Sequence, residues 1–177
     1  MMPLTENVPK PMAPHNGSTL IANQINKLSM FIPNIHVTVG YKGPVLAEHV
    51  IASNATSVIN TTGRSNSWWI HNTLLSYVNE PVYVMTCDNI TKLDFEMLED
   101  DYHHQKKPPC MLIGVEPHPE LEGDYIFHNN NKVYKLGRIE PSSLYCSGIQ
   151  IINPFQVKNL TSDRGDFYNI WEQYWII

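Results

Sequence analysis

Apolar positions in the first two thirds of the chain alternate between helical and strand-like patterns. Helices are predicted at Thr19–Phe31, where apolar residues recur at helical spacing, at Pro44–Ala52, at Trp68–Val78 and from Asp94 to about Gln105. Short apolar runs predict strands at Ile35–Val39, Ser57–Thr61 and Pro81–Cys87. In the Trp68–Val78 helix, Leu74 and Leu75 are expected on the buried side. This alternation indicates an α/β fold with a mainly parallel sheet.

The last third of the chain changes to strands separated by turns. Strands are predicted at Cys110–Val115, Tyr125–His128, Lys132–Leu136 and Tyr145–Ile152. The run Asn129-Asn130-Asn131 predicts the turn between the middle two strands, which makes the sheet mixed. A final helix is predicted from about Asp166, and the proline-rich opening Met1–Pro14 is predicted to be a loop.

Composition indicates an ordinary globular protein of one domain, 1–177. Hydrophobic residues make up 42% of the 177 residues and charged residues 16%. The net charge of -5 disfavours a nucleic-acid-binding surface, which needs clustered Lys and Arg. No apolar run is long enough to span a membrane, and the first residues lack the apolar core of a signal peptide. We therefore expect a cytoplasmic protein that binds neither nucleic acid nor membrane.

Two residues are candidates for chemistry from their local sequence. Asp88 follows the apolar Pro81–Cys87 run, and ligands of open α/β sheets bind beyond the carboxyl ends of strands. Its carboxylate suits Mg²⁺, although the same residue could simply cap a turn. Lys10 stands between Pro9 and Pro11, which stiffen the backbone and favour a phosphate contact, although an exposed loop lysine is the commoner case for such a segment alone. By contrast, His103 and His104 are neighbours on a predicted helix, so they point apart and are interpreted as surface residues.

Several segments match the motifs of one enzyme family in order along the chain. They are Pro3-Leu4-Thr5 with Pro9-Lys10-Pro11-Met12, Asn16-Gly17-Ser18-Thr19-Leu20-Ile21, Val37-Thr38-Val39-Gly40-Tyr41, Cys87-Asp88-Asn89 and Cys146-Ser147-Gly148-Ile149. Together they resemble the sugar-1-phosphate nucleotidyltransferase family over almost the whole chain. The strongest element is the P-L-T and P-K-P pair in register with the later aspartate.

This resemblance implies a three-layer αβα, Rossmann-like nucleotide-diphospho-sugar transferase fold with a mixed, mainly parallel sheet. It also implies transfer of a nucleoside monophosphate from a nucleoside triphosphate (NTP) to a sugar-1-phosphate, with release of pyrophosphate. Lys10 would neutralise phosphate charge, and Asp88 would hold Mg²⁺. Nucleotide and substrate would be bound by Asn66, Ser67, Cys146, Ser147 and Gly148.

The chain also departs from the family pattern. The first strand with its Gly-rich loop, and the later segment with a second metal-binding aspartate, have no counterpart in it. A truncated piece and a degenerate domain are both compatible with this, and the sheet edge left open favours self-association, with a homo-oligomer as one outcome. The Asn66-Ser67 pair resembles the choline-phosphate cytidylyltransferase branch, so phosphocholine is an alternative acceptor. A non-catalytic nucleotide-binding relative is the third hypothesis, and the sequence leaves the base open.

Overall fold

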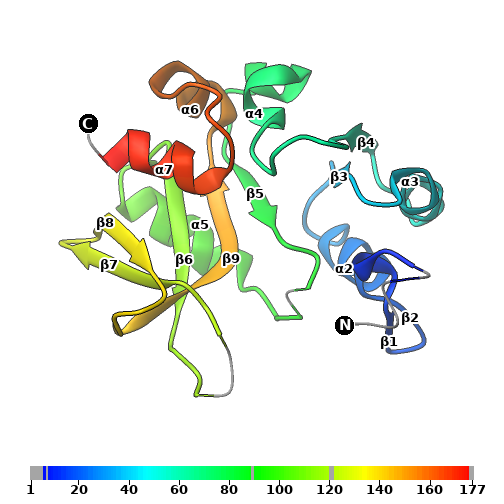
Figure 1. Ribbon diagram of the computed structural model, residues 1–177, viewed down its shortest axis with the longest axis horizontal. Helices are drawn as coiled ribbons and strands as arrows, with labels where there is room; N and C mark the ends of the chain where they lie inside the picture. Colours follow the sequence, from blue (N-terminus) through cyan, green and yellow to red (C-terminus); the bar gives the residue numbers. More distant parts are fainter. Residues whose placement is uncertain (1–5, 7, 89, 120–121, 176–177) are drawn as a thin grey trace. The chain divides into compact units, whose positions relative to one another are not determined.

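The computed structural model describes residues 6, 8–88, 90–119 and 122–175 (Figure 1). By its internal contacts the chain divides into unit 1, Met1–Ser65 with Cys87–Phe95, and unit 2, Asn66–Thr86 with Glu96–Ile177. Each unit is described by itself below. The motif residues Pro3, Leu4, Thr5 and Asn89 lie outside the described residues.

Unit 1 is built around one parallel strand–helix–strand element. Its elements are η1 (Lys10–Met12), β1 (Pro14–His15), β2 (Ser18–Thr19), α2 (Leu20–Leu28), β3 (His36–Val39), α3 (Gly43–Ala52) and β4 (Ser57–Asn60). Strands β3 and β4 pair in parallel, with His36 opposite Ser57 and Val39 opposite Asn60. Helix α3 connects them, as parallel pairing requires a crossover. The parallel part of the predicted sheet therefore lies here.

Helices α2 and α3 and strand β3 bury their apolar residues in one cluster. The cluster consists of Ile21, Ile25, Val39, Leu46 and Val50. Helix α2 begins where the sequence predicts, because the Thr19 hydroxyl accepts a hydrogen bond from the Ala22 amide at 3.2 Å. It ends at Leu28, three residues before the predicted end. Before it, Asn16 and Gly17, both at positive φ, form the turn of a small β1–β2 hairpin that the sequence analysis did not predict.

Unit 2 holds a five-stranded sheet with helices. Its elements are α4 (Trp69–Asn72), η2 (Leu74–Tyr77), β5 (Val82–Met85), α5 (Phe95–His104, of which Phe95 belongs to unit 1), β6 (Cys110–Val115), β7 (Tyr125–Asn129), β8 (Lys132–Gly137), β9 (Leu144–Ile152), α6 (Pro154–Leu160) and α7 (Phe167–Trp175). Figure 1 shows α7 in front of this sheet and α5 behind it.

The long strand β9 organises the sheet of unit 2. It pairs antiparallel with β5, β6 and β7, and β7 continues into β8 through the predicted Asn129–Asn131 turn. Strands β5 and β6 point the same way, but β9 lies between them, so they do not pair with each other. The mainly parallel pairing predicted from the alternating pattern is therefore not found within unit 2. The α/β class and the mixed character of the sheets agree with the prediction.

Helix α7 covers one face of β9 through a buried polar contact. The Gln150 side-chain oxygen accepts a hydrogen bond from the Trp171 indole nitrogen at 3.1 Å, and both residues are buried. Because side chains alternate along a strand, Ile149 and Ile151 point to the opposite face, where they are also buried. Burying this amide is tolerated because its oxygen has a partner. The final helix predicted from Asp166 is thereby confirmed.

Asp124, just before β7, and Arg138, just after β8, form an ion pair. The Arg138 guanidinium donates to the Asp124 carboxylate at 2.5 Å. Burial raises the pKa of Asp124, but hydrogen bonds from Arg138 and Tyr168, with the Arg138 charge, outweigh it and hold this pKa below its ordinary value. Tyr168 lies on α7, so this carboxylate bridges the sheet and the final helix.

The predicted helix Trp68–Val78 is wrong in two respects. It is broken at Thr73, whose hydroxyl donates to the Trp69 carbonyl at 2.8 Å and accepts from the Leu75 amide at 3.2 Å, so η2 starts as a separate turn. Leu74, predicted to be buried, is 85% exposed. Side-chain capping by threonine competes here with continuation of the helix. Helix α6 was not predicted, although Asn153 caps it ahead of a proline in its first turn.

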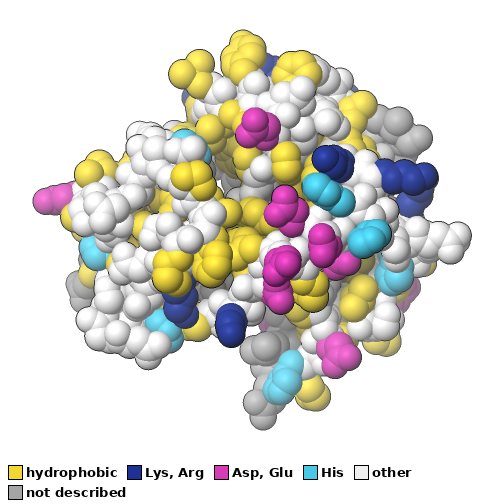
Figure 2. Space-filling model, turned by 180° about the vertical axis from the view of Figure 1, so that it is seen from behind, with side chains coloured by type: hydrophobic (Ala, Val, Ile, Leu, Met, Phe, Trp, Pro, Cys, Tyr) yellow, Lys and Arg dark blue, Asp and Glu magenta, His cyan; other side chains and the backbone are white. Residues whose placement is uncertain are grey.

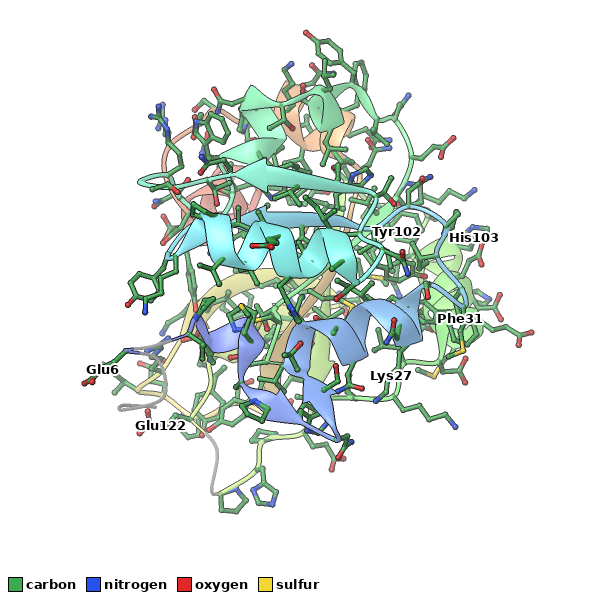
Figure 3. The ribbon with its side chains drawn as sticks, turned by 90° about the vertical axis from the view of Figure 1, so that its right-hand side faces the viewer. Glu6, Lys27, Phe31, Tyr102, His103 and Glu122 are labelled. Atoms are coloured by element: carbon green, nitrogen blue, oxygen red, sulfur yellow. The ribbon has the colours of Figure 1, made fainter. Side chains whose placement is uncertain are left out.

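The surface of α5 follows the predicted pattern. Tyr102 is buried and its neighbour His103 is exposed, as the labelled side chains of Figure 3 allow the reader to follow. His104 is exposed as well, so the interpretation of both histidines as surface residues is confirmed. Figure 2 shows acidic side chains gathered on one face, next to histidine and basic (Lys or Arg) side chains. None of the helices in the described part of the chain has the length and apolar character needed to cross a bilayer.

The core of unit 1 makes a direct prediction about stability. Ile25 in α2 is 1% exposed, whereas Ile51 in α3 is 61% exposed. We expect Ile25→Ala to lower the free energy of unfolding by roughly 2–5 kcal/mol, because a buried side chain leaves a cavity. The matched change Ile51→Ala should alter it by less than about 0.5 kcal/mol. Denaturant unfolding measures both, and equal losses in the two variants would refute this core.

Candidate functional site

Lys10 lies on a short turn that is anchored on both sides. The Met12 amide bonds to the Pro9 carbonyl at 2.8 Å, and the Ala13 amide bonds to the Lys10 carbonyl at 3.0 Å. Pro9 is buried, and Met12 packs against the apolar cluster of unit 1. The prolines fix φ on either side of Lys10. The backbone is thus held while the Lys10 side chain remains 44% exposed.

Asp88 reaches the same part of unit 1 from 78 positions away in the sequence. Cys87 packs against the cluster that also holds Met12, and this brings the next residue, Asp88, beside Lys10. The Lys10 ammonium donates a hydrogen bond to Asp88 Oδ2, and the two form an ion pair. The Asp88 side chain is 41% exposed, so both charged groups remain accessible to a ligand.

The pairing changes the proton affinity of nearby groups. The hydrogen bond from Lys10 to Asp88 raises the pKa of Lys10, against a smaller lowering by burial. Burial raises the pKa of the Cys87 thiol, and the Asp88 charge raises it further. Lys10 is therefore protonated and positively charged at neutral pH, and Cys87 is an uncharged thiol. All three cysteines of the chain are free and half-buried.

The described residues fit Mg²⁺ only as an ion shared with a substrate. No group of three or more His, Cys, Asp or Glu side chains that could hold a metal occurs among them. One exposed carboxylate is nevertheless the usual protein contribution where Mg²⁺ is also bound by substrate phosphates. Asp88 can supply that carboxylate, provided that it exchanges its bond to Lys10 for the ion.

The carboxyl end of β3 contributes a residue that the sequence analysis missed. Lys42 lies in the loop after β3 and donates a hydrogen bond from its ammonium to the backbone carbonyl of Glu6. The N-terminal segment that leads to Lys10, which includes the labelled Glu6 of Figure 3, is thus tied to this loop. The position of Lys42 just beyond a parallel strand was a signal that could have identified it.

Asn66 and Ser67 hold the C-terminal segment of unit 2. The Asn66 side-chain oxygen accepts a hydrogen bond from the Phe167 amide at 3.1 Å, at the start of α7. The Ser67 hydroxyl donates to the Gly165 carbonyl at 2.5 Å, and Ser67 is 0% exposed. In this conformation Ser67 offers no group to a ligand. The role of this pair in substrate binding stays a prediction, whereas the structure shows that both residues hold the start of α7 in place.

Cys146, Ser147 and Gly148 form an irregularity in β9. Gly114 pairs with Cys146 and Leu112 with Gln150, so three residues of β9 stand opposite the single Ile113. The Ser147 hydroxyl donates to the Ile113 carbonyl at 2.6 Å, and Gly148 has a φ of 76°, which suits glycine. Its carbonyl accepts from the Thr86 amide at 3.2 Å, at the end of β5. The bulge therefore lies beside the strand that leads toward Asp88.

Comparison with known proteins bears on the family. No family model matches the chain. The bifunctional protein GlmU of Methanococcus aeolicus is 24% identical over 137 residues, which are 77% of this chain and 32% of that protein. The chain thus spans about a third of the length of this relative.

Solved structures share the fold. HddC from Yersinia pseudotuberculosis has a TM-score of 0.73 at 16% identity, covering 90% of this chain and 74% of its own. A Bacillus anthracis protein assigned as a glucose-1-phosphate thymidylyltransferase has a TM-score of 0.69 at 18% identity, covering 92% and 71%. The CTP:phosphocholine cytidylyltransferase of Streptococcus pneumoniae has 0.64 at 16%, covering 90% and 69%.

The chain is similar in sequence to GlmU and shares its fold with solved nucleotidyltransferase structures. The family resemblance inferred from the motifs is confirmed by the sequence match to GlmU and by the shared αβα fold. The particular reaction and the roles of the individual residues stay predictions.

The adjacent tryptophans at the start of α4, Trp68 and Trp69, differ in their surroundings. Trp69 is buried in the core, whereas Trp68 is half-buried. A cage for a quaternary ammonium needs exposed ring faces, so Trp69 cannot form one in this conformation. Trp69 therefore packs in the core of unit 2.

The ion pair predicts a measurable change in the pKa of Lys10. Asp88→Asn removes the main cause of the shift, so the pKa of Lys10 should fall, because the remaining burial lowers it. NMR titration of the lysine side-chain carbons measures this value. Asp94→Asn, a carboxylate of the same segment, is the control and should leave it unchanged. An unchanged pKa in Asp88→Asn would rule out the pair.

The same pair sets the sign of a pH effect on folding. A raised lysine pKa means that its contribution to stability is complete below the ordinary value of 10.5 and is lost as pH rises through the raised value. Because both side chains are well exposed, this contribution is less than about 1 kcal/mol.

Proposed function

We propose that the chain provides the nucleotidyl-transfer site of a sugar-1-phosphate nucleotidyltransferase. An oxygen of the sugar-1-phosphate would attack the α-phosphorus of an NTP, the bond between the α-phosphorus and its bridging oxygen would break, and pyrophosphate would leave. The observation that carries this proposal is the exposed ion pair of Lys10 and Asp88, two residues of matching family motifs that meet in unit 1. GlmU and the assigned glucose-1-phosphate thymidylyltransferase support the reaction class.

The chemistry of the pair suits this reaction. Nucleotidyl transfer depends on positioning and on neutralising phosphate charge more than on covalent catalysis. The Lys10 ammonium can donate to phosphate oxygens once it leaves Asp88, and the turn between Pro9 and Pro11 limits where it can point. Mg²⁺ held by Asp88 would neutralise further charge on the reacting phosphates. Each residue of the pair would then exchange its partner for the substrate.

Other residues are assigned to the acceptor side. The bulge of Cys146, Ser147 and Gly148 exposes irregular backbone in β9, and glycine allows a ligand to approach closely. Asn66, which is exposed, would contact the nucleotide or acceptor. Ser67 would support it indirectly through its bond to Gly165. These assignments, the cytoplasmic location and self-association remain part of the proposal.

A second acceptor has specific support. The Asn66-Ser67 pair resembles the choline-phosphate cytidylyltransferase branch, and the Streptococcus pneumoniae CTP:phosphocholine cytidylyltransferase shares the fold. Transfer of CMP from CTP to phosphocholine is therefore the alternative. The burial of Trp69 removes one candidate for recognising the choline group, which makes the sugar-1-phosphate the better-supported acceptor.

Pyrophosphate release tests the proposal directly. The chain, and any longer protein in the same reading frame, is incubated with Mg²⁺, a panel of NTPs and either sugar-1-phosphates or phosphocholine. Lys10→Ala and Asp88→Ala should each lower kcat/KM by about 100-fold or more, while the free energy of unfolding changes by less than about 1 kcal/mol.

A matched lysine provides the control. Lys135 also forms an exposed ion pair, with Glu140 at 2.6 Å, so Lys135→Ala should leave kcat/KM within about twofold of the unchanged protein. No release above background from folded protein would refute the enzymatic proposal and favour a non-catalytic relative. Losses in rate that match losses in stability would make Lys10 and Asp88 structural residues.

A further inference from the structure

A hollow of about 460 Å³ lies on unit 2, and none of the residues assigned to nucleotidyl transfer lines it. It is lined by residues 71–74, by Ser76 and Tyr77, and by Lys158. These residues come from α4, η2 and α6, and Figure 1 shows α4 and α6 next to each other. The volume falls within the range of small-molecule sites.

The break in the chain at Thr73 shapes this hollow. Thr73 ends α4 and its hydroxyl caps η2, so the following turn does not continue the helix. Leu74 and Tyr77 are left strongly exposed as a result. An apolar side chain that is exposed beside a hollow offers contact area to the apolar part of a ligand.

Lys158 is the cation of the hollow. Its ammonium donates to the Ser76 hydroxyl at 3.1 Å and lies 4.4 Å from the centroid of the Tyr77 ring. It takes part in none of the ion pairs found among the described residues. Its contacts are a hydroxyl, a ring face and the carboxyl end of α6, which carry only partial negative charge, and the Asp163 carboxylate that also acts on His71 forms no ion pair with it.

The pKa of His71 depends on the charges around this hollow. Burial lowers the pKa of His71, the Asp163 carboxylate raises it and the Lys158 charge lowers it. The Asp163 carboxylate is bound to the Asn72 amide at 2.7 Å. The other neighbour of the imidazole is the Thr161 hydroxyl, 3.5 Å from Nε2. An anion placed on Lys158 would cancel its effect and raise the pKa of His71.

We propose that this hollow binds a small organic anion, with its phosphate or carboxylate on Lys158 and its apolar part against Tyr77 and Leu74. The cation fixes one end of the ligand, and the exposed apolar side chains receive the other. The site is independent of Lys10 and Asp88 and of the proposed nucleotidyl transfer.

Four probes separate the contributions of charge and apolar contact. Phenyl phosphate and benzoate carry both, benzyl alcohol lacks the charge, and inorganic phosphate lacks the ring. Binding is measured on the whole chain by NMR titration, with the imidazole signals of His71 as the reporter. We expect phenyl phosphate or benzoate to bind about tenfold or more tightly than benzyl alcohol or inorganic phosphate, and to raise the pKa of His71. Tighter binding of phenyl phosphate than of benzoate would identify a phosphate site. Tighter binding of benzoate would identify a carboxylate site.

Variants decide whether Lys158 is responsible. Lys158→Met should remove the advantage of the charged probes, and Lys158→Arg should retain most of it. Lys135→Met is the matched control, because Lys135 also lies over an aromatic ring, 4.9 Å from the Phe127 centroid, but has a carboxylate partner. Lys10→Met should leave the His71 response unchanged, which separates this site from the nucleotide site.

Two results would overturn the proposal. One is equal affinity for benzyl alcohol and the charged probes. The other is an undiminished response in Lys158→Met. Should Lys158→Met fail to fold, loss of the response in Lys158→Gln decides the question, and its persistence there would equally refute the site.

Discussion

The packing of two distant segments against one apolar cluster holds the candidate site together. Met12 and Cys87 both contact the cluster of Ile21, Ile25, Val39, Leu46 and Val50, and the charged residues Lys10 and Asp88 stand two and one positions away from them. An ion pair as exposed as this one contributes at most about 1 kcal/mol, whereas a buried aliphatic side chain contributes several times as much. The core positions the charges. The charges themselves are left available for exchange with phosphate and metal.

Most elements could be predicted because their signals are local. Apolar spacing with a threonine cap marks α2, and three asparagines mark the turn between β7 and β8. The mistakes arise where a local alternative competes with the regular pattern. Thr73 caps a new turn inside the predicted helix and leaves Leu74 in solvent, and β9 lies between two strands that alternation alone would place together. Strand order depends on contacts between distant segments, and the spacing of apolar residues along the chain carries no information about those contacts.

The candidate site could be predicted in part. The family motifs and the strand-end rule identified Lys10 and Asp88 separately, but their direct contact depends on tertiary packing across 78 positions. The motif also identified Asn66 and Ser67 without revealing that they bind Phe167 and Gly165, since a motif records residue types and not their partners. The position of Lys42 beyond a parallel strand could have marked it as a candidate, but its bond to the Glu6 backbone carbonyl could not be read from the sequence.

The central claim is that the ion pair opens when substrate binds. Lys10 then contacts the triphosphate, and Asp88 contacts the metal ion. Calorimetric titration with a non-hydrolysable NTP, with and without Mg²⁺, tests it most directly. The account predicts that Asp88→Ala binds the triphosphate more tightly than the unchanged chain without Mg²⁺, because Lys10 is released and a negative charge is gone. With Mg²⁺ the same variant should bind more weakly, and Lys10→Ala should bind more weakly in both conditions. An Asp88→Ala affinity that shifts in the same direction with and without Mg²⁺ would contradict the account.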